Sequence, residues 1–137
     1  VIGAVALVTA LVIAVMEHRR ANRLEQNRTA DFRKVVRSLV ADLNAKASAL
    51  EGAAKGENGS EPHWSEWRQL ATDVQASLEA VLPTAPPVPN EVVAVAAMIR
   101  RLKRSEAFRD RIPSVPGHVD HATDVRDGLE AEIAKLG

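Results

Sequence analysis

The first 16 residues constrain this chain more than any other part of its sequence. The run VIGAVALVTALVIAVM carries no charged side chain, and the next seven residues, EHRRANR, carry four. As a helix, 16 residues rise about 24 Å, against about 30 Å for the hydrocarbon core of a bilayer. The nine valine, isoleucine and leucine residues of the run each favour insertion by roughly 0.3 to 0.6 kcal/mol.

An uncharged run of this kind fits a core helix, a cleaved export signal or a membrane anchor. A core helix would show a polar face, and this run has none. A signal peptide would end at a cleavage site with small residues, whereas this run ends in Val15-Met16-Glu17. We therefore expect residues 1–16 to form a transmembrane anchor. Because the sequence starts at Val1 rather than at methionine, we also expect N-terminal residues to be missing from it.

The charges that follow the run indicate an orientation. Seven cations lie between residues 17 and 37, namely Arg19, Arg20, Arg23, Arg28, Arg33, Lys34 and Arg37. Cationic residues just after a span tend to stay in the cytoplasm. The sequence thus predicts a single-pass membrane protein with a cytoplasmic soluble domain, although an N-terminal flank with more cations would reverse this orientation.

Small residues recur along one side of the apolar run. Gly3, Ala6, Ala10 and Ala14 are spaced by three, four and four residues. Small residues at such spacing let a neighbouring transmembrane helix approach closely. We predict a packing face for another membrane helix here, with the general abundance of alanine as the alternative explanation.

The rest of the chain indicates helices separated by clear breaks. Apolar residues recur at helical spacing, and the breaks fall in "EGAAKGENGSEP" (51–62), "LPTAPPVPN" (82–90) and "IPSVPG" (112–117). The second of these is expected to be a stiff, extended connector. The predicted buried stripes are Phe32, Val36, Leu39, Leu43 and Leu50 with Val35 and Val40 beside them; Trp67, Leu70, Val74, Leu78 and Val81; Val92, Val95, Ile99, Leu102, Phe108 and Ile112; and Ala122, Val125, Leu129, Ile133 and Leu136.

These patterns predict an all-α fold. A single N-terminal transmembrane helix (1–16) leads into a membrane-proximal helix (17–50), which continues into a small antiparallel bundle of about four helices completed by residues 60–137. Polar residues before each stripe are candidate N-caps, namely Ser60 or Glu61, Asn90 and Asp120.

Composition excludes several functions. Lysine plus arginine and aspartate plus glutamate each total 18, so no net charge favours nucleic acid as a partner. Cysteine is absent, which excludes disulfides and thiolate metal sites. Abundant alanine and arginine are typical of a GC-rich bacterial genome.

Candidate chemistry is sparse. No glycine-rich phosphate loop is present. The stretch "HVDH" brings His118, Asp120, His121 and Asp124 into zinc-ligand spacing, but a capping aspartate and surface histidines explain it more simply. We expect no catalytic residue, no cofactor and no metal site, and hence a protein that is not an enzyme.

Two further features invite a binding interpretation. The segment "RRLKRSEAFRDR" (100–111) carries six cations. Five of them form a possible patch for anionic lipid or a partner protein, namely Arg100, Arg101, Lys103, Arg104 and Arg111. The alternative is a solvated face. Trp64 and Trp67 lie too far from the anchor to contact the bilayer if the first helix is unbroken, and we expect them in the core.

The sequence therefore favours a membrane-anchored helical protein that is a structural or accessory subunit of a larger membrane complex. Its expected partners are the lipid bilayer and other membrane subunits. The alternative is a scaffold or regulator that forms a homo-oligomer through its heptad stripe. A metal-dependent enzyme built on "HVDH" is the remote alternative.

Overall fold

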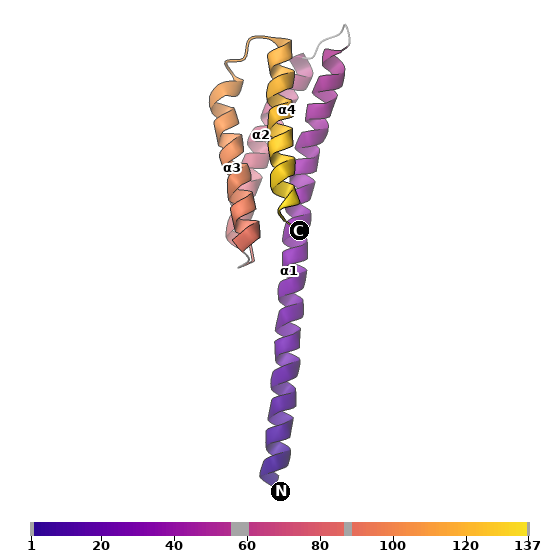
Figure 1. The fold of residues 1–137 in the computed structure, drawn as a ribbon, viewed down its shortest axis with the longest axis vertical. Helices are drawn as coiled ribbons and strands as arrows, with labels where there is room; N and C mark the ends of the chain where they lie inside the picture. Colours follow the sequence, from indigo (N-terminus) through magenta and orange to yellow (C-terminus); the bar gives the residue numbers. More distant parts are fainter. Residues whose placement is uncertain (1, 56–60, 87–88, 137) are drawn as a thin grey trace.

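The chain forms one very long helix that carries a helical bundle along its C-terminal part (Figure 1). This computed structural model describes residues 2–55, 61–86 and 89–136, without the side chains of residues 2–4 and 89. The helices are α1 (Ile2–Ala54), α2 (Glu61–Val81), the short 3₁₀ helix η1 (Leu82–Thr84), α3 (Pro89–Arg109) and α4 (Val115–Ala134). No strand occurs within these ranges. The predicted all-helical bundle of about four helices is confirmed.

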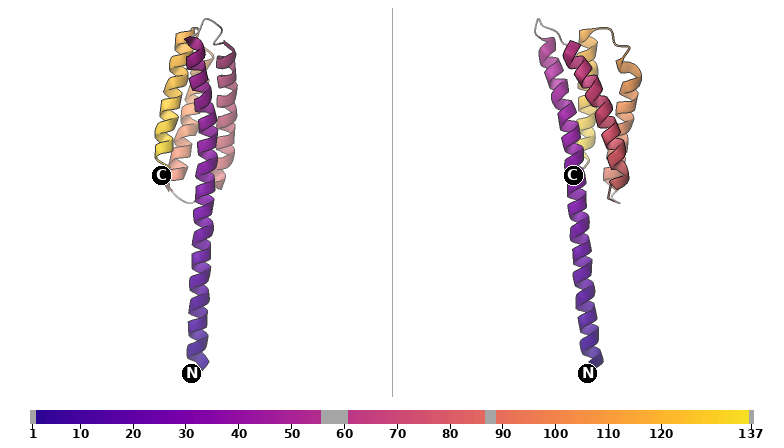
Figure 2. Two further views of the ribbon diagram at one scale, coloured as in Figure 1. Left: turned by 90° about the vertical axis from the view of Figure 1, so that its right-hand side faces the viewer. Right: turned by 180° about the vertical axis from the view of Figure 1, so that it is seen from behind.

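Successive helices run antiparallel. The C-terminal part of α1 packs against α2 and α4, and α3 packs against the same two helices from the opposite side. Helices α1 and α3 therefore lie diagonally across the bundle. We call the end of the bundle that is nearer the start of α1 its lower end. The N-terminal part of α1 projects well beyond this lower end of the bundle (Figure 2).

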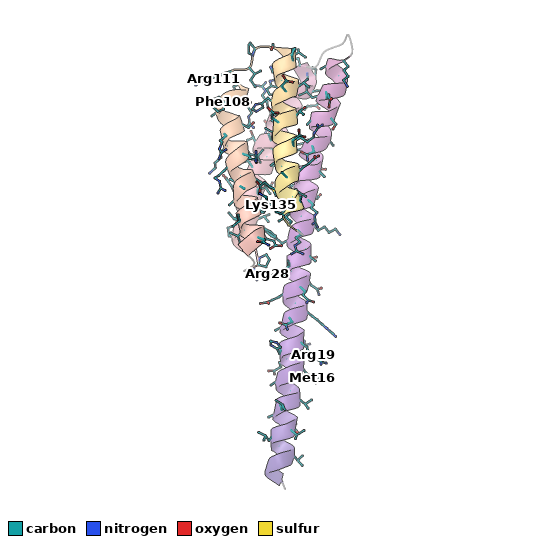
Figure 3. The ribbon with its side chains drawn as sticks, viewed as in Figure 1. Met16, Arg19, Arg28, Phe108, Arg111 and Lys135 are labelled. Carbon is teal, nitrogen blue, oxygen red and sulfur yellow. The ribbon has the colours of Figure 1, made fainter. Side chains whose placement is uncertain are left out.

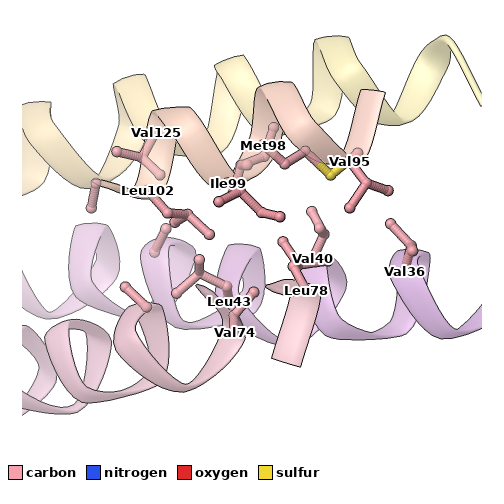
Figure 4. Close-up of a cluster of buried hydrophobic side chains, with 14 of the residues drawn as sticks. Val36, Val40, Leu43, Val74, Leu78, Val95, Met98, Ile99, Leu102 and Val125 are labelled. Carbon is pink, nitrogen blue, oxygen red and sulfur yellow. The ribbon is translucent and has the colours of Figure 1, made fainter. Parts of the chain in front are cut away.

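All four helices bury residues at alternating spacings of three and four, the repeat of a coiled-coil seam. Polar residues occupy some of these positions, mostly near the helix ends. The seam residues are Val36, Val40, Leu43, Ala47 and Leu50 in α1; Trp64, Trp67, Ala71, Val74 and Leu78 in α2; Glu91, Val95, Met98, Leu102, Ser105 and Arg109 in α3; and His118, Ala122, Val125, Leu129 and Glu132 in α4, with Leu136 following in the turn after α4. Figure 4 shows apolar members of this seam meeting in the middle of the bundle.

Several predicted core residues lie elsewhere. Val35, Val92 and Phe108 are exposed, Phe108 to 61 %. The prediction at Phe108 was wrong because it counted apolar residues only, whereas the seam of α3 passes through Ser105 and Arg109. The partly buried predicted residues, which flank the seam, are Leu39, Leu70, Val81, Ile112 and Ile133.

The breaks are close to those expected, but their local structure differs. Helix α1 continues four residues past the predicted end to Ala54, and residues 56–60 of the expected loop, with the candidate cap Ser60, lie outside the described residues. The connector expected to be extended begins instead with η1, a 3₁₀ turn, while residues 87 and 88 are not described. Asn90 is not a cap, because α3 already begins at residue 89.

Ser114, and not Asp120, caps α4. Its backbone is extended (φ −122°, ψ 150°), and its hydroxyl accepts a hydrogen bond from the backbone N–H of Gly117. Pro116 fits in the first turn because its missing N–H would have no helical partner there. A Cβ on Gly117 would lie 2.7 Å from Ile112 Cγ2, so this tight entry needs glycine.

Helix α1 passes from the apolar run into the charged residues without interruption. The predicted transmembrane helix has no support from length and hydropathy, since no helix in the described ranges is long and apolar enough to cross a membrane.

Candidate interaction surfaces

The N-terminal part of α1 exposes apolar side chains around its whole circumference. We call residues 5–16 the apolar segment. Its large side chains are exposed by 44 to 73 %, and they are Val5, Leu7, Val8, Leu11, Val12, Ile13, Val15 and Met16. Consecutive residues such as Leu11, Val12 and Ile13 point in three different directions. Figure 3 shows Met16 and Arg19 on bare helix, well below the bundle.

The predicted small-residue face lies within this segment. Ala6, Ala10 and Ala14 are exposed, so a neighbouring helix has access to them. Gly3 belongs to α1, but its surroundings lie outside the described residues. The packing role of this face stays a prediction.

A buried ion pair closes the lower end of the bundle. Glu91 of α3 is completely buried, and its Oε1 accepts a hydrogen bond of 2.7 Å from Nε of Arg33 in α1. Nη2 of Arg33 contacts the same oxygen, while Oε2 of Glu91 has no hydrogen-bond partner among the residues that the structure describes. The pair links the two diagonal helices. Sequence reasoning missed it, although Glu91 stands four residues before Val95 in the seam.

Aromatic rings fill the core near the upper end of the bundle. The Trp64 ring is sandwiched between Trp67 and His118, with centroid distances of 5.4 and 4.2 Å and nearly parallel planes. His121 meets both tryptophans edge-on, at 6.1 and 5.8 Å. The expectation that the tryptophans lie in the core is confirmed.

The two histidines of "HVDH" each lie within hydrogen-bond distance of another protein group. His118 Nε2 lies 2.8 Å from the backbone oxygen of Ile112. Asp120 and Asp124 face solvent. In the described part of the chain, no three metal-ligating side chains gather at one point. The expectation of surface histidines was nevertheless wrong for His118, which occupies a seam position.

His121 pairs with a serine that sequence reasoning did not single out. Its Nε2 lies 2.6 Å from Oγ of Ser105, which joins α4 to α3. A Ser–His pair is part of a nucleophilic triad, but a triad also needs an acid that orients the imidazole. No described carboxylate is hydrogen-bonded to His121, and Asp124 shares only the shallow groove beside it. A polar contact between two helices is what this geometry supports.

The surroundings of His121 predict a pH effect on stability. Burial lowers the pKa of His121 below 6.5, and Arg109 lowers this pKa further. Because the unfolded chain then binds more protons than the folded one, the free energy of unfolding should fall as the pH drops from about 7 to about 5. Urea unfolding at both pH values measures this fall.

Two histidine variants provide the test of that effect. His121→Gln keeps a side chain that can hydrogen-bond to Ser105 and should flatten the pH dependence. His18→Gln lies on exposed helix below the bundle and should leave the dependence unchanged. Equal slopes for wild type and His121→Gln would refute the assignment.

The predicted cationic patch on α3 is divided among several contacts. Arg101 lies over Gly128, where a Cβ would come within 2.5 Å of its Nη1, and it reaches Glu132 at 3.9 Å. Lys103 pairs with Glu79 of α2 at 3.3 Å. Three members are exposed and make no side-chain hydrogen bond or ion pair within the described ranges, namely Arg100, Arg104 and Arg111.

The upper end of this patch lies far from the apolar segment, which weakens its predicted contact with lipid. Asp110, at the end of α3, pairs with Arg68 of α2 at 3.0 Å, and the neighbouring turn of α2 pairs Glu66 with Lys46 of α1 at 2.7 Å. The upper end of α3 is therefore level with Lys46, about 45 Å along α1 from Met16. Phe108 and Arg111 lie at this end in Figure 3. A membrane that holds the apolar segment is beyond the reach of this end of the patch.

Comparison of the chain with models of protein families, with curated proteins and with solved structures found no match.

Proposed function

We propose that this chain is a membrane-anchored helical protein whose bundle is a structural or accessory part of a membrane complex. The observation that carries the proposal is the apolar segment, which projects from the bundle and is apolar on every side. A protein partner would cover one side of a single helix and leave the others in water. Lipid surrounds a helix completely.

The length of the segment limits how it sits in the bilayer. Even with residues 2–4 of α1 included, the helix rises only about 22 Å as far as Met16, less than the hydrocarbon core of about 30 Å. Short segments are accommodated by local thinning of the bilayer and by flanking cations whose side chains extend to the headgroups. Arg19 and Arg20 directly follow the segment and suit this role.

The bundle supports a docking role more than self-association. The seam of α1 between Val36 and Leu50 packs against α2 and α4 of the same chain. A homo-oligomer built on that stripe would have to open the bundle. The outer surface of the folded bundle remains for contact with another subunit, and α1 holds it clear of the bilayer.

Carbonate extraction of membranes tests the anchor. Wild type should remain in the membrane pellet, whereas Leu7→Arg/Leu11→Arg should enter the soluble fraction. Each arginine near the middle of a span costs about 2.5 to 3.5 kcal/mol. Leu24→Arg, on an equally exposed leucine of α1 beyond the segment, is the matched control and should stay in the pellet. Release of wild type by carbonate would refute the anchor.

Cross-linking in native membranes tests the accessory role. If the proposal holds, a distinct membrane protein should cross-link to the bundle in constant proportion. Cross-links only between copies of this chain would favour the homo-oligomeric scaffold instead.

A further inference from the structure

We infer that Arg19, Arg20 and Arg23 form a binding site for the headgroups of anionic phospholipids. This inference rests on the proposed insertion of the apolar segment and adds the class of lipid. It also moves the lipid contact from α3, where the sequence placed it, to α1.

Arg19 and Arg20 lie at the depth of the headgroups, and Arg23 lies just outside it, close enough for its side chain to reach back. They follow Met16 by three to seven residues, which is about 4 to 10 Å along the helix. The polar region on each side of a bilayer is about 5 to 8 Å thick. With Met16 at the edge of the hydrocarbon core, all three guanidinium groups fall within reach of the lipid phosphates.

The site occupies one side of α1. Spacings of three, four and seven residues from Met16 bring Arg19, Arg20 and Arg23 to the same side of the helix. With Ile13, Met16 and Glu17 they line one shallow depression on the surface. Apolar side chains thus lie directly below the cations. This is the same order in which acyl chains and headgroups follow each other in one leaflet of a bilayer. Glu17 is the single acid among these residues.

The cations after the apolar segment fall into two groups, those that contact the bundle and those that do not. Arg28 donates a hydrogen bond of 3.1 Å to the backbone oxygen of Thr84, and Arg33 pairs with Glu91, so both hold α1 to the bundle. Arg19, Arg20 and Arg23 are exposed and make no hydrogen bond or ion pair with any residue that the structure describes. Their charges are free for an external anion.

Guanidinium groups suit this anion. Arginine presents paired N–H donors that match two phosphate oxygens, and it keeps its charge at every physiological pH. An anionic phospholipid adds a net negative charge that a zwitterionic one lacks. The three arginines should therefore increase the affinity for anionic lipids beyond the affinity that the apolar segment provides for any bilayer.

Binding of the full chain to vesicles of two compositions tests the inference. One set is phosphatidylcholine alone, and the other contains phosphatidylglycerol as well. The anionic vesicles should bind wild type more tightly, by about fivefold for each arginine and on the order of 100-fold for all three. Arg19→Gln/Arg20→Gln/Arg23→Gln should lose this gain in affinity for anionic vesicles and still bind phosphatidylcholine vesicles. Circular dichroism verifies that the bundle remains folded.

The matched control replaces three exposed arginines far from the apolar segment, two in α3 and one in the turn that follows it. Arg100→Gln/Arg104→Gln/Arg111→Gln removes the same charge from the cationic patch at residues 100–111 and should keep the full preference for anionic vesicles. Loss of the gain in this control, or its persistence in the α1 variant, would overturn the assignment. Binding to both vesicle types without a preference would overturn the headgroup site and leave the anchor standing.

Two further outcomes separate the remaining explanations. If wild type binds neither kind of vesicle, the anchor itself fails, and the headgroup site fails with it. Inorganic phosphate should release no more protein from anionic vesicles than sodium chloride at the same ionic strength. Greater release by phosphate would mean that the arginines bind free phosphate, which contradicts the inference.

Discussion

Replacing Arg33 with methionine should lower the free energy of unfolding by about 3 kcal/mol. The substitution leaves the completely buried carboxylate of Glu91 without its cation. Breaking a buried pair from one side is expensive because the remaining charge is neither hydrated nor paired. We place the loss at the low end for such pairs because the Arg33 side chain is still 32 % exposed. Against a total stability of about 5 to 15 kcal/mol, this loss is large.

Urea unfolding followed by circular dichroism measures this loss on a chain that begins at Glu17. Residues 2–16, which that chain lacks, lie outside the bundle. Arg33→Met/Glu91→Leu should recover most of the stability, because an apolar pair of similar size replaces the buried charges.

An exposed ion pair between α1 and α2 provides the control. Lys46 and Glu66 are 2.7 Å apart, with side chains 42 and 53 % exposed. Lys46→Met should therefore change stability by no more than about 1 kcal/mol. Equal losses for Arg33→Met and Lys46→Met would show that burial of Glu91 has no energetic consequence.

The extent of the helices was predictable because it depends on local features. Glycine and proline clusters mark the breaks, and seam residues such as Val36, Leu43 and Leu50 repeat every seven residues. The polar seam positions were harder to predict. Glu91 looks like a surface residue until Arg33, 58 positions earlier in the chain, is known to lie opposite it. Such partners are set by tertiary packing and leave no mark in local periodicity.

The candidate surfaces show the same limit. The sequence indicates clusters of cations after the apolar segment and on α3, but it does not show which of them are already paired. Arg28 and Arg33 resemble Arg19 and Arg23 in sequence, and the bundle uses only the first two. On α3, Arg101 lies over a glycine of α4, a contact that no spacing within α3 could predict. Only the arrangement of the four helices separates structural cations from free ones.

Truncation of Leu43 to alanine should lower the free energy of unfolding by about 2 to 5 kcal/mol. Leu43 is a seam residue of α1 with 0 % exposure, and it faces α2 near Val74 in the centre of the bundle (Figure 4). Its removal loses apolar burial and leaves a cavity that the neighbouring helices can only partly fill. Urea unfolding of the chain that begins at Glu17 measures the loss.

Leu24→Ala makes the same chemical change on the same helix at a leucine that is 64 % exposed. Both substitutions raise the intrinsic helix propensity by the same small amount, so their difference isolates burial. The control should stay within about 0.5 kcal/mol of wild type, as surface substitutions usually do. If Leu43→Ala were equally mild, the seam of α1 would not be packed against the other three helices. The bundle would then be a loose assembly that needs a partner to close it, and α1 could not serve as a rigid connection between the membrane and a folded domain.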